Sequence, residues 1–114
     1  MVRKPKGTRA ACPVTEALGV IGNRWTLLIV QEALEGTRRF SEFQGNLGLA
    51  KNILSARLKS LIGHGIFEAA PASDGSAYRE YILTHKGRAL LPALGALRQW
   101  AKTFHVRSEG PARE

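Results

Sequence analysis

Apolar residues recur along the chain with the spacing of amphipathic helices, interrupted where glycine, proline and asparagine gather. Val14, Leu18 and Ile21 recur at i, i+4 and i+7, which predicts a first helix. The segment 24–35 is apolar almost all round, a pattern typical of a buried helix, and Asn23 suits its N-cap. We therefore expect 24–35 to be the central core helix.

Two shorter apolar stripes follow, separated by a stretch that holds Gly45, Asn46 and Gly48. The first predicts a helix of about two turns near 39–46, and the second predicts a helix that begins near Ala50. Two short helices joined by a tight glycine-containing turn form the helix-turn-helix pattern. The apolar positions are Phe40, Phe43 and Leu47 in the first helix and Leu54, Leu58, Leu61 and Ile62 in the second.

The last part of the chain predicts a hairpin and a long helix. Segments 66–70 and 78–83 are β-prone and flank a turn-rich stretch with an Asp-Gly pair, which indicates a hairpin. A hairpin placed directly after a helix-turn-helix is the arrangement called a wing. Thr84 can cap a final helix over 85–105, which Pro92 should kink. The expected fold is mostly α (α+β), a winged helix-turn-helix with a two-stranded wing.

The apolar stripe of the final helix is longer than so small a domain should bury by itself. Spare apolar helix surface invites a partner subunit, although part of the stripe can fold back on the chain's own core. The candidate dimer-interface residues are Leu90, Leu94, Leu97, Trp100 and Phe104.

Charge indicates the kind of partner. The chain of 114 residues has 17 Lys plus Arg against 9 Asp plus Glu, a formal net charge of +8 and a pI near 10.4. This balance favours polyanions, either nucleic acid or an anionic membrane surface. No apolar run approaches the roughly 20 residues that span a bilayer, and the N-terminus lacks an apolar signal-peptide core. A single cysteine excludes an intrachain disulfide, so we expect a cytoplasmic protein.

The domain organisation follows from the same patterns. We expect one domain over 11–105, preceded by a flexible basic arm at 1–10 and followed by a disordered tail at 106–114. The arm carries no acidic residue and could add phosphate affinity, although a solubilising tail is the preferred interpretation.

The side of the 50–63 helix opposite its apolar stripe is basic and small-polar, and it has no acidic residue. Lysine and arginine suit phosphates and guanine, asparagine suits adenine, and an alanine methyl suits thymine, so this face could read a major groove. A solvated basic face is the alternative, and this stretch alone does not decide between them. The candidate base contacts are Asn52, Ser55, Ala56 and Lys59, and the candidate phosphate contacts are Lys51 and Arg57.

No catalytic or metal-binding arrangement is predicted. His64, His85 and His105 lie far apart and near no acidic or cysteine cluster, so they show neither metal-ligand spacing nor the pattern of a catalytic triad. We expect no enzyme activity, no cofactor and no bound metal.

Five motifs follow one another along the chain: Cys12-Pro13-Val14, 18–29 (LGVIGNRWTLLI), 38–43 (RRFSEF), 53–61 (ILSARLKSL) and 80–90 (EYILTHKGRAL). In this order they resemble the HxlR-type winged-helix transcription regulators, and the resemblance covers roughly Cys12 to Trp100. The resemblance implies a homodimer that binds double-stranded DNA at a pseudo-palindromic operator and regulates transcription. It implies that the first and last helices form the dimer interface, and it makes DNA contact the favoured interpretation of the basic helix face.

The sequence departs from the family pattern in two places. Ala50 stands where many members carry Ser or Thr as the N-cap of the recognition helix, and a capping hydroxyl is usually worth about 1 kcal/mol. In the wing, Tyr78-Arg79 replaces the more usual basic-then-apolar order. Arg79 is nevertheless the natural candidate for a phosphate or minor-groove contact.

Cys12 is a candidate thiol sensor. The resemblance implies this role, because a cysteine at this position senses oxidants or electrophiles in some members. A thiol at a helix N-terminus beside a basic arm is also biased toward the reactive thiolate. A small, unreactive packing residue is the alternative, and it is preferred on the sequence alone. Without a second cysteine, reaction could give only an intersubunit disulfide, a mixed disulfide or an adduct.

The sequence thus predicts a sequence-specific transcription regulator that acts as a homodimer, has no membrane partner and has an unspecified small-molecule effector. Two alternatives stay open. One is a nucleoid-type DNA binder without sequence preference, and the other is a winged-helix module that binds protein or RNA.

Overall fold

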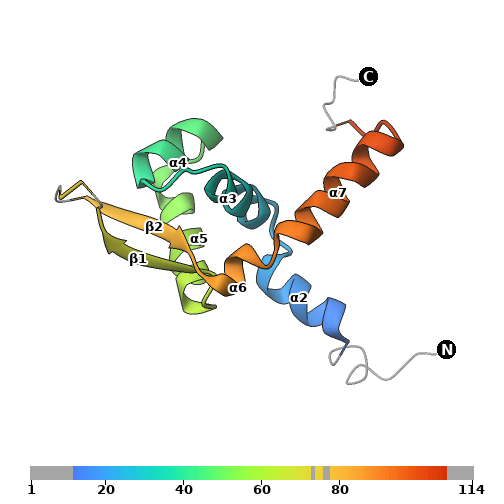
Figure 1. Cartoon of the computed structure of the whole chain (residues 1–114), viewed down its shortest axis with the longest axis horizontal. Coiled ribbons are helices and arrows are strands. Elements are labelled where there is room, and N and C mark those ends of the chain that lie inside the picture. The colour runs from blue at the N-terminus through green and yellow to red at the C-terminus, as the bar shows by residue number, and fades with distance from the viewer. Residues whose placement is uncertain (1–11, 73, 76–77, 108–114) are drawn as a thin grey trace.

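The computed structural model describes residues 12–72, 74–75 and 78–107, so the expected basic arm at 1–10 and tail residues 108–114 lie outside the described residues. The elements are α2 (Pro13–Ile21), α3 (Arg24–Leu34), α4 (Phe40–Leu47), α5 (Lys51–Gly63), β1 (Phe67–Pro71), β2 (Arg79–Leu83), α6 (His85–Arg88) and α7 (Leu91–Thr103). In Figure 1 the wing extends to one side of α3, and α2 and α7 project from the other. The predicted winged helix-turn-helix is confirmed.

Residue type explains where several helices begin and end. The Asn23 side chain accepts a hydrogen bond from the Trp25 N–H at 2.8 Å, which caps α3. The Thr84 hydroxyl accepts one from the Gly87 N–H at 3.0 Å, which caps α6. Gly48 ends α4 in the left-handed region, with φ 66°, where a side chain would be strained.

The core forms around α3, which contacts α2, α4, α5, α7 and β2. Ile29 and Val30 of α3 are fully buried, so the prediction of a central core helix is confirmed. Phe43 of α4 meets Phe67 of β1 edge to face, with ring centroids 6.2 Å apart. The other members of the core cluster are Leu49, Leu54, Leu58, Leu61, Ile66, Leu83 and Leu94.

One residue of the apolar stripe predicted on α5 is more exposed than expected. Leu54, Leu58 and Leu61 are buried as expected, but Ile62 is 37 % exposed. At about 100° per residue, Ile62 turns away from the line that the three leucines share. The buried stripe of α5 is therefore narrower than predicted.

The wing is an antiparallel pair in which Phe67 faces Leu83 and Pro71 faces Arg79. The chain before α4 adds a short third edge, because the Tyr81 N–H donates to the Arg38 carbonyl at 2.7 Å. The adjoining residue, Arg39, forms a single bridge with the second residue of β2. This edge fixes the first half of β2 to the start of α4.

The predicted final helix is wrong in one respect. Instead of one helix kinked at Pro92, the chain forms α6 and α7, which are separated at Ala89 and Leu90. Pro92 lies in the first turn of α7, where its missing N–H has no intrahelical partner to lose. The proline therefore sets the start of a new helix and does not distort an existing one.

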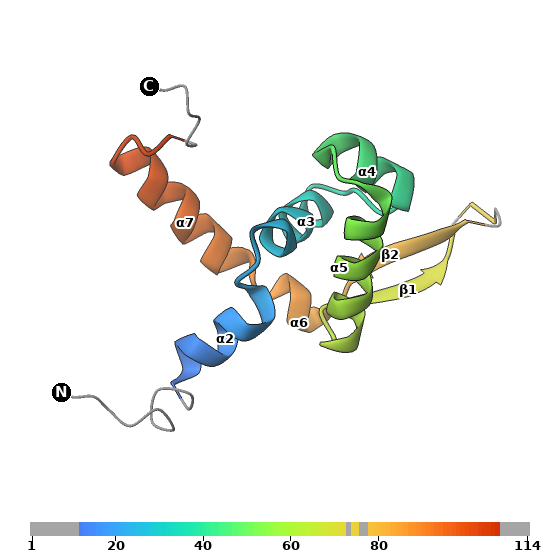
Figure 2. The ribbon, with the colours of Figure 1, turned by 180° about the vertical axis from the view of Figure 1, so that it is seen from behind.

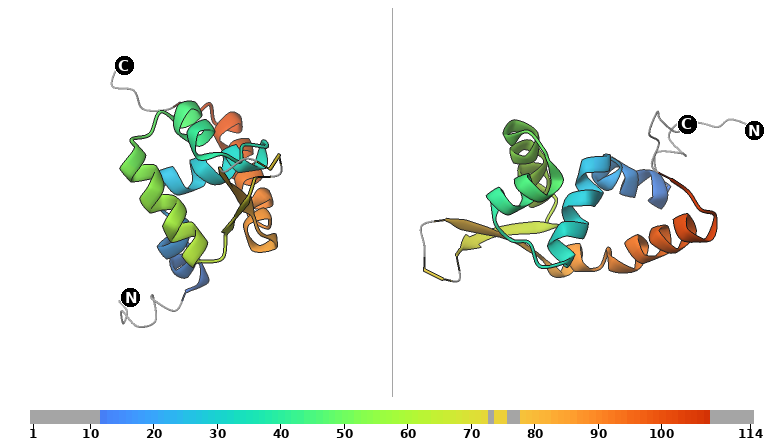
Figure 3. Two further views of the ribbon diagram at one scale, coloured as in Figure 1. Left: turned by 90° about the vertical axis from the view of Figure 1, so that its left-hand side faces the viewer. Right: turned by 90° about the horizontal axis from the view of Figure 1, so that it is seen from above.

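Helices α2 and α7 diverge from each other in Figure 1, and Figure 3 shows both on the side of the molecule away from the wing. Large apolar side chains on both helices are exposed. Leu94 is only 6 % exposed and belongs to the chain's own core, with the half-buried Leu90 packed against it. Both were predicted as interface residues, and that prediction stays a proposal, to which Leu94 can contribute little exposed surface. The large apolar side chains that stay exposed on these helices are Val14, Leu18, Leu91, Leu97 and Trp100, and Phe104 follows at the end of α7.

Candidate DNA-binding surface

Helices α4 and α5 form the helix-turn-helix. They contact each other and both pack on α3. The turn between them uses the left-handed Gly48 and the buried Leu49, which anchors the connection in the core. In Figure 2, α5 lies beside the wing, and it contacts β1 directly. Its core-facing side is thereby covered, and the opposite side is left to solvent.

The exposed side of α5 carries most of the candidate DNA contacts. The exposed candidates are Lys51, Asn52, Ser55, Ala56 and Lys59, whereas Arg57 is partly buried. Ile53, which the sequence analysis did not select, is 39 % exposed and lies next to Asn52. The face therefore offers cationic, amide, hydroxyl and apolar groups together, as groove recognition requires.

The first turn of α5 has no side-chain cap from its N-cap residue. Ala50 has extended backbone angles, φ −64° and ψ 146°, and supplies no capping side chain. Its carbonyl accepts from the Ile53 N–H at 3.1 Å and the Leu54 N–H at 3.0 Å. Because helix N-termini carry partial positive charge, this turn with the exposed Lys51 favours an anionic group nearby.

The other end of α5 is fixed by Lys86, which the sequence analysis missed, and by Thr84, for which it predicted only a capping role. Lys86 of α6 donates to the His64 carbonyl at 2.8 Å. The Thr84 hydroxyl lies 2.5 Å from the Gly65 carbonyl and 3.1 Å from that of Ile66. These bonds connect the end of α5 to the end of β2, so they hold the exposed face of α5 at a set position relative to the wing.

Arg79, the candidate wing contact, is exposed at the start of β2. The next residue, Glu80, is buried, and its carboxylate lies 3.5 Å from the guanidinium of Arg38. At the hairpin turn of the wing, a hydrogen bond and ion pair with Asp74 raise the pKa of Arg39. The wing thus keeps Arg79 at the surface while its neighbours form internal pairs.

Cys12 is exposed in the single chain, at the N-cap of α2, which does not fit the preferred interpretation of a buried packing residue. The backbone N–H groups of Thr15 and then Val14 favour the thiolate and lower the pKa of Cys12. Exposure and a lowered pKa are two features that a reactive thiol needs.

Within the ranges 12–72, 74–75 and 78–107, no three His, Cys, Asp or Glu residues gather as a metal site would require. In the same ranges, each helix is too short or too polar to cross a lipid bilayer.

Comparison with known proteins places residues 20–109 in the HxlR-like helix-turn-helix family. The HTH-type transcriptional regulator Rv3095 of Mycobacterium tuberculosis is 44 % identical over 98 residues, which cover 86 % of this chain. The chain spans 62 % of the length of that relative.

Solved structures show the same fold. The crystal structure of PA1607 has a TM-score of 0.80 and 51 % identity, and the match covers 93 % of this chain and 74 % of that one. The reduced form of the redox regulator HypR has a TM-score of 0.74 and 27 % identity, and the match covers 83 % of this chain and 95 % of that one.

Proposed function

This chain belongs to the HxlR-like helix-turn-helix family, and on that premise we propose that it is a sequence-specific DNA-binding transcription regulator that acts as a homodimer. The observation that carries the proposal is the exposed, acid-free face of α5 beside an exposed arginine of the wing. Helix α5 enters a major groove of a pseudo-palindromic operator, and Arg79 contacts a phosphate or the minor groove.

The roles of individual residues follow from their chemistry. Asn52, Ser55, Ala56 and Lys59 lie at base edges, because amide, hydroxyl, methyl and ammonium groups match the pattern of the major groove. Lys51 and Arg57 neutralise phosphates, and Lys51 does so next to the positive end of α5. The net charge of +8 supports the same partner, since it attracts polyanions.

Dimerisation is supported by the apolar surface of α2 and α7. Val14, Leu18, Leu97, Trp100 and Phe104 are each more than half exposed in the single chain. The rings of Trp100 and Phe104 also lie next to each other in a tilted arrangement, with centroids 6.1 Å apart, so they form one continuous aromatic patch. Burying this surface against a second copy would remove it from water and set the distance between two recognition helices.

Control by oxidants or electrophiles through Cys12 is a second part of the proposal. Its exposure and lowered pKa support it, as does the similarity to the redox regulator HypR. An electrophile forms an adduct when the thiolate attacks it. A peroxide removes two electrons from the thiolate and leaves a sulfenic acid, which a second thiolate converts to a disulfide with loss of hydroxide.

Fluorescence anisotropy with genomic DNA fragments, competitor DNA and a salt series tests the regulator. The expected result is one or a few fragments bound roughly a thousandfold more tightly than the rest. Equal affinity for all fragments would indicate a nucleoid-type binder. Absence of DNA binding at low salt would favour the protein or RNA module. Either result would overturn the proposal.

A further inference from the structure

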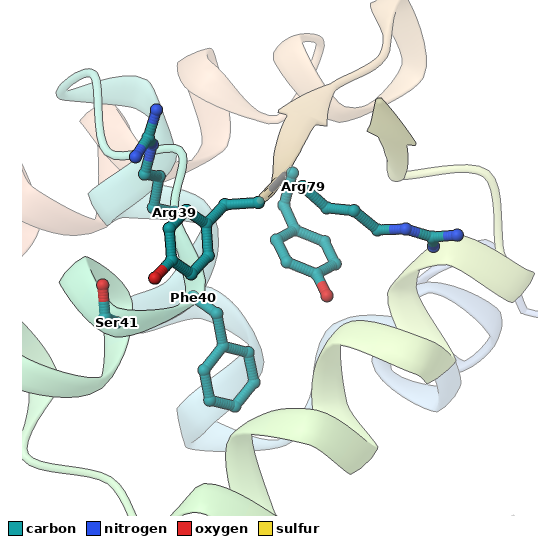
Figure 4. Close-up of a pocket in the computed structure, with 6 residues that line it drawn as sticks. Arg39, Phe40, Ser41 and Arg79 are labelled. Atoms are coloured by element: carbon teal, nitrogen blue, oxygen red, sulfur yellow. The ribbon is translucent and has the colours of Figure 1, made fainter. Parts of the chain in front are cut away.

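A hollow of about 350 Å³ lies where the start of β2, next to the hairpin turn of the wing, meets the start of α4. We call it the wing pocket. Figure 4 shows Arg39 and Arg79 on opposite sides of it, with the ring of Phe40 between these sides. The residues that line it are Arg39, Phe40, Ser41, Tyr78, Arg79 and Tyr81.

The wall of the pocket is mainly aromatic. Phe40 and Tyr81 are half-buried and pack on the edge of the core, which fixes two of the rings. Tyr78 is 69 % exposed, and the guanidinium of Arg39 lies 5.7 Å from its ring centroid, within cation–π range. The volume falls in the range of small-molecule sites, and such a wall favours a planar aromatic ring by stacking.

The two arginines of the pocket differ in what they can offer a ligand. Arg39 is engaged, because it forms an ion pair with Asp74 and stacks on Tyr78. Arg79 is exposed, and its guanidinium forms no hydrogen bond or ion pair with any residue that the structure describes. In Figure 4 the Arg79 side chain runs outward from the ring of Phe40, so its guanidinium lies at the rim of the pocket. A guanidinium presents a fork of donors that matches a carboxylate, which makes Arg79 the candidate anion-binding group.

We propose that the wing pocket binds a small aromatic carboxylate, whose ring lies among Phe40, Tyr78 and Tyr81 and whose carboxylate pairs with Arg79. We further propose that this ligand lowers the affinity for DNA, which rests on the proposed function, because Arg79 is also the candidate wing contact. One guanidinium cannot serve a carboxylate and the DNA backbone at the same time. Ligand and DNA therefore weaken each other's binding by the same factor.

Isothermal titration calorimetry without DNA, at constant ionic strength, tests the pocket. The probes are benzoate, benzamide, acetate and inorganic phosphate. We expect benzoate to bind once per chain, about tenfold or more tightly than the other probes, since only benzoate uses both the rings and Arg79. Binding of phosphate as tight as that of benzoate would indicate a site for DNA phosphates only and would overturn the proposal.

Variants locate the binding. Arg79→Gln removes the cation, and Ser41→Trp places a ring in the pocket from an exposed position. Each should weaken benzoate binding about tenfold or more, whereas Arg98→Gln, which removes an exposed arginine from α7, should leave it unchanged. Benzoate should also shift the backbone amide signals of Phe40, Ser41 and Tyr81 in the wild-type protein, a measurement that needs no variant. Shifts confined to other residues would overturn the site.

A separate titration tests the coupling to DNA. Saturating benzoate should weaken the binding of the preferred DNA fragment to the wild type but not to Arg79→Gln. Benzoate binding with no change in DNA affinity would overturn the coupling. Failure of DNA binding in the absence of benzoate would contradict the proposed function alone, because the calorimetry contains no DNA.

Discussion

At the scale of single residues, the candidate base contacts depend on which side chains of α5 share its solvent-facing side. Asn52 and Lys59 are exposed there, opposite the buried leucines of the same helix, as helical periodicity predicts. The buried Glu80 could not be predicted, because its ion pair with Arg38 joins positions 42 residues apart. The pocket beside Arg79 depends on the same long-range contact between β2 and the start of α4.

Two substitutions test the face of α5 that we assign to DNA. Asn52→Ala and Lys59→Ala should each weaken binding of the preferred fragment by about 1 to 3 kcal/mol, since each removes a base contact. Thermal unfolding should not change, because both side chains are exposed. Lys102→Ala, which removes an exposed lysine from α7, is the matched control. Wild-type affinity of both variants would mean that another face of α5 meets the DNA.

The lowered pKa of Cys12 predicts a shifted pH dependence of alkylation. The rate of alkylation by iodoacetamide should rise with pH, and its midpoint pH should be lower for the folded chain than for the same chain unfolded in urea. The reason is that the Thr15 and Val14 N–H groups stabilise the thiolate only in the folded chain. By linkage, the stabilisation of the folded state by the Cys12 thiolate is fully present above the pKa of Cys12 in the unfolded chain. It is lost as the pH falls through the pKa of Cys12 in the folded chain. A midpoint equal to or above that of the unfolded chain would contradict the proposed activation.

At the scale of elements, the predicted segments were confirmed where an apolar stripe and its stop signals agreed. Helices α3, α4 and α5 begin and end within a residue or so of their predicted bounds. The prediction of one final helix was wrong because the apolar pattern continues through Pro92, whereas Pro92 lies in the first turn of a second helix, α7. The third edge of the wing was missed because a bridge at Arg39 leaves no periodic signal.

The uncapped start of α5 predicts a gain in stability. Ala50→Ser should raise the free energy of unfolding by about 1 kcal/mol, because a hydroxyl can accept from an amide of the first turn. Chemical denaturation measures the change. Ala56→Ser, the same substitution on the exposed middle of α5, is the control and should be neutral or slightly destabilising. No gain from Ala50→Ser over wild type would mean that the first turn is already satisfied by another group.

At the scale of the whole molecule, the single chain is elongated, with extents of 57 × 38 × 26 Å, because α2 and α7 project from the body (Figure 1). The sequence indicated more apolar surface than one chain can bury. It could not show which apolar side chains of α7 are covered by the chain's own core and which stay exposed. Leu94 faces α3 and is buried, whereas Leu97, one turn further on, has no such cover. That division depends on where α7 leaves the body, which only the three-dimensional packing defines.

The exposed part of α7 therefore predicts a dimer that one charge should break. Sedimentation at micromolar concentration should give a dimer for the wild type, and Leu97→Glu should raise the dissociation constant roughly thirtyfold or more, because it buries an unpaired carboxylate at an apolar contact. The same variant should lose affinity for the preferred DNA fragment, since two recognition helices no longer bind together. Gln99→Glu adds the same charge on another side of α7 and should leave both properties intact. A wild-type chain that stays monomeric on its operator, or a Leu97→Glu variant that remains dimeric, would remove α7 from the interface.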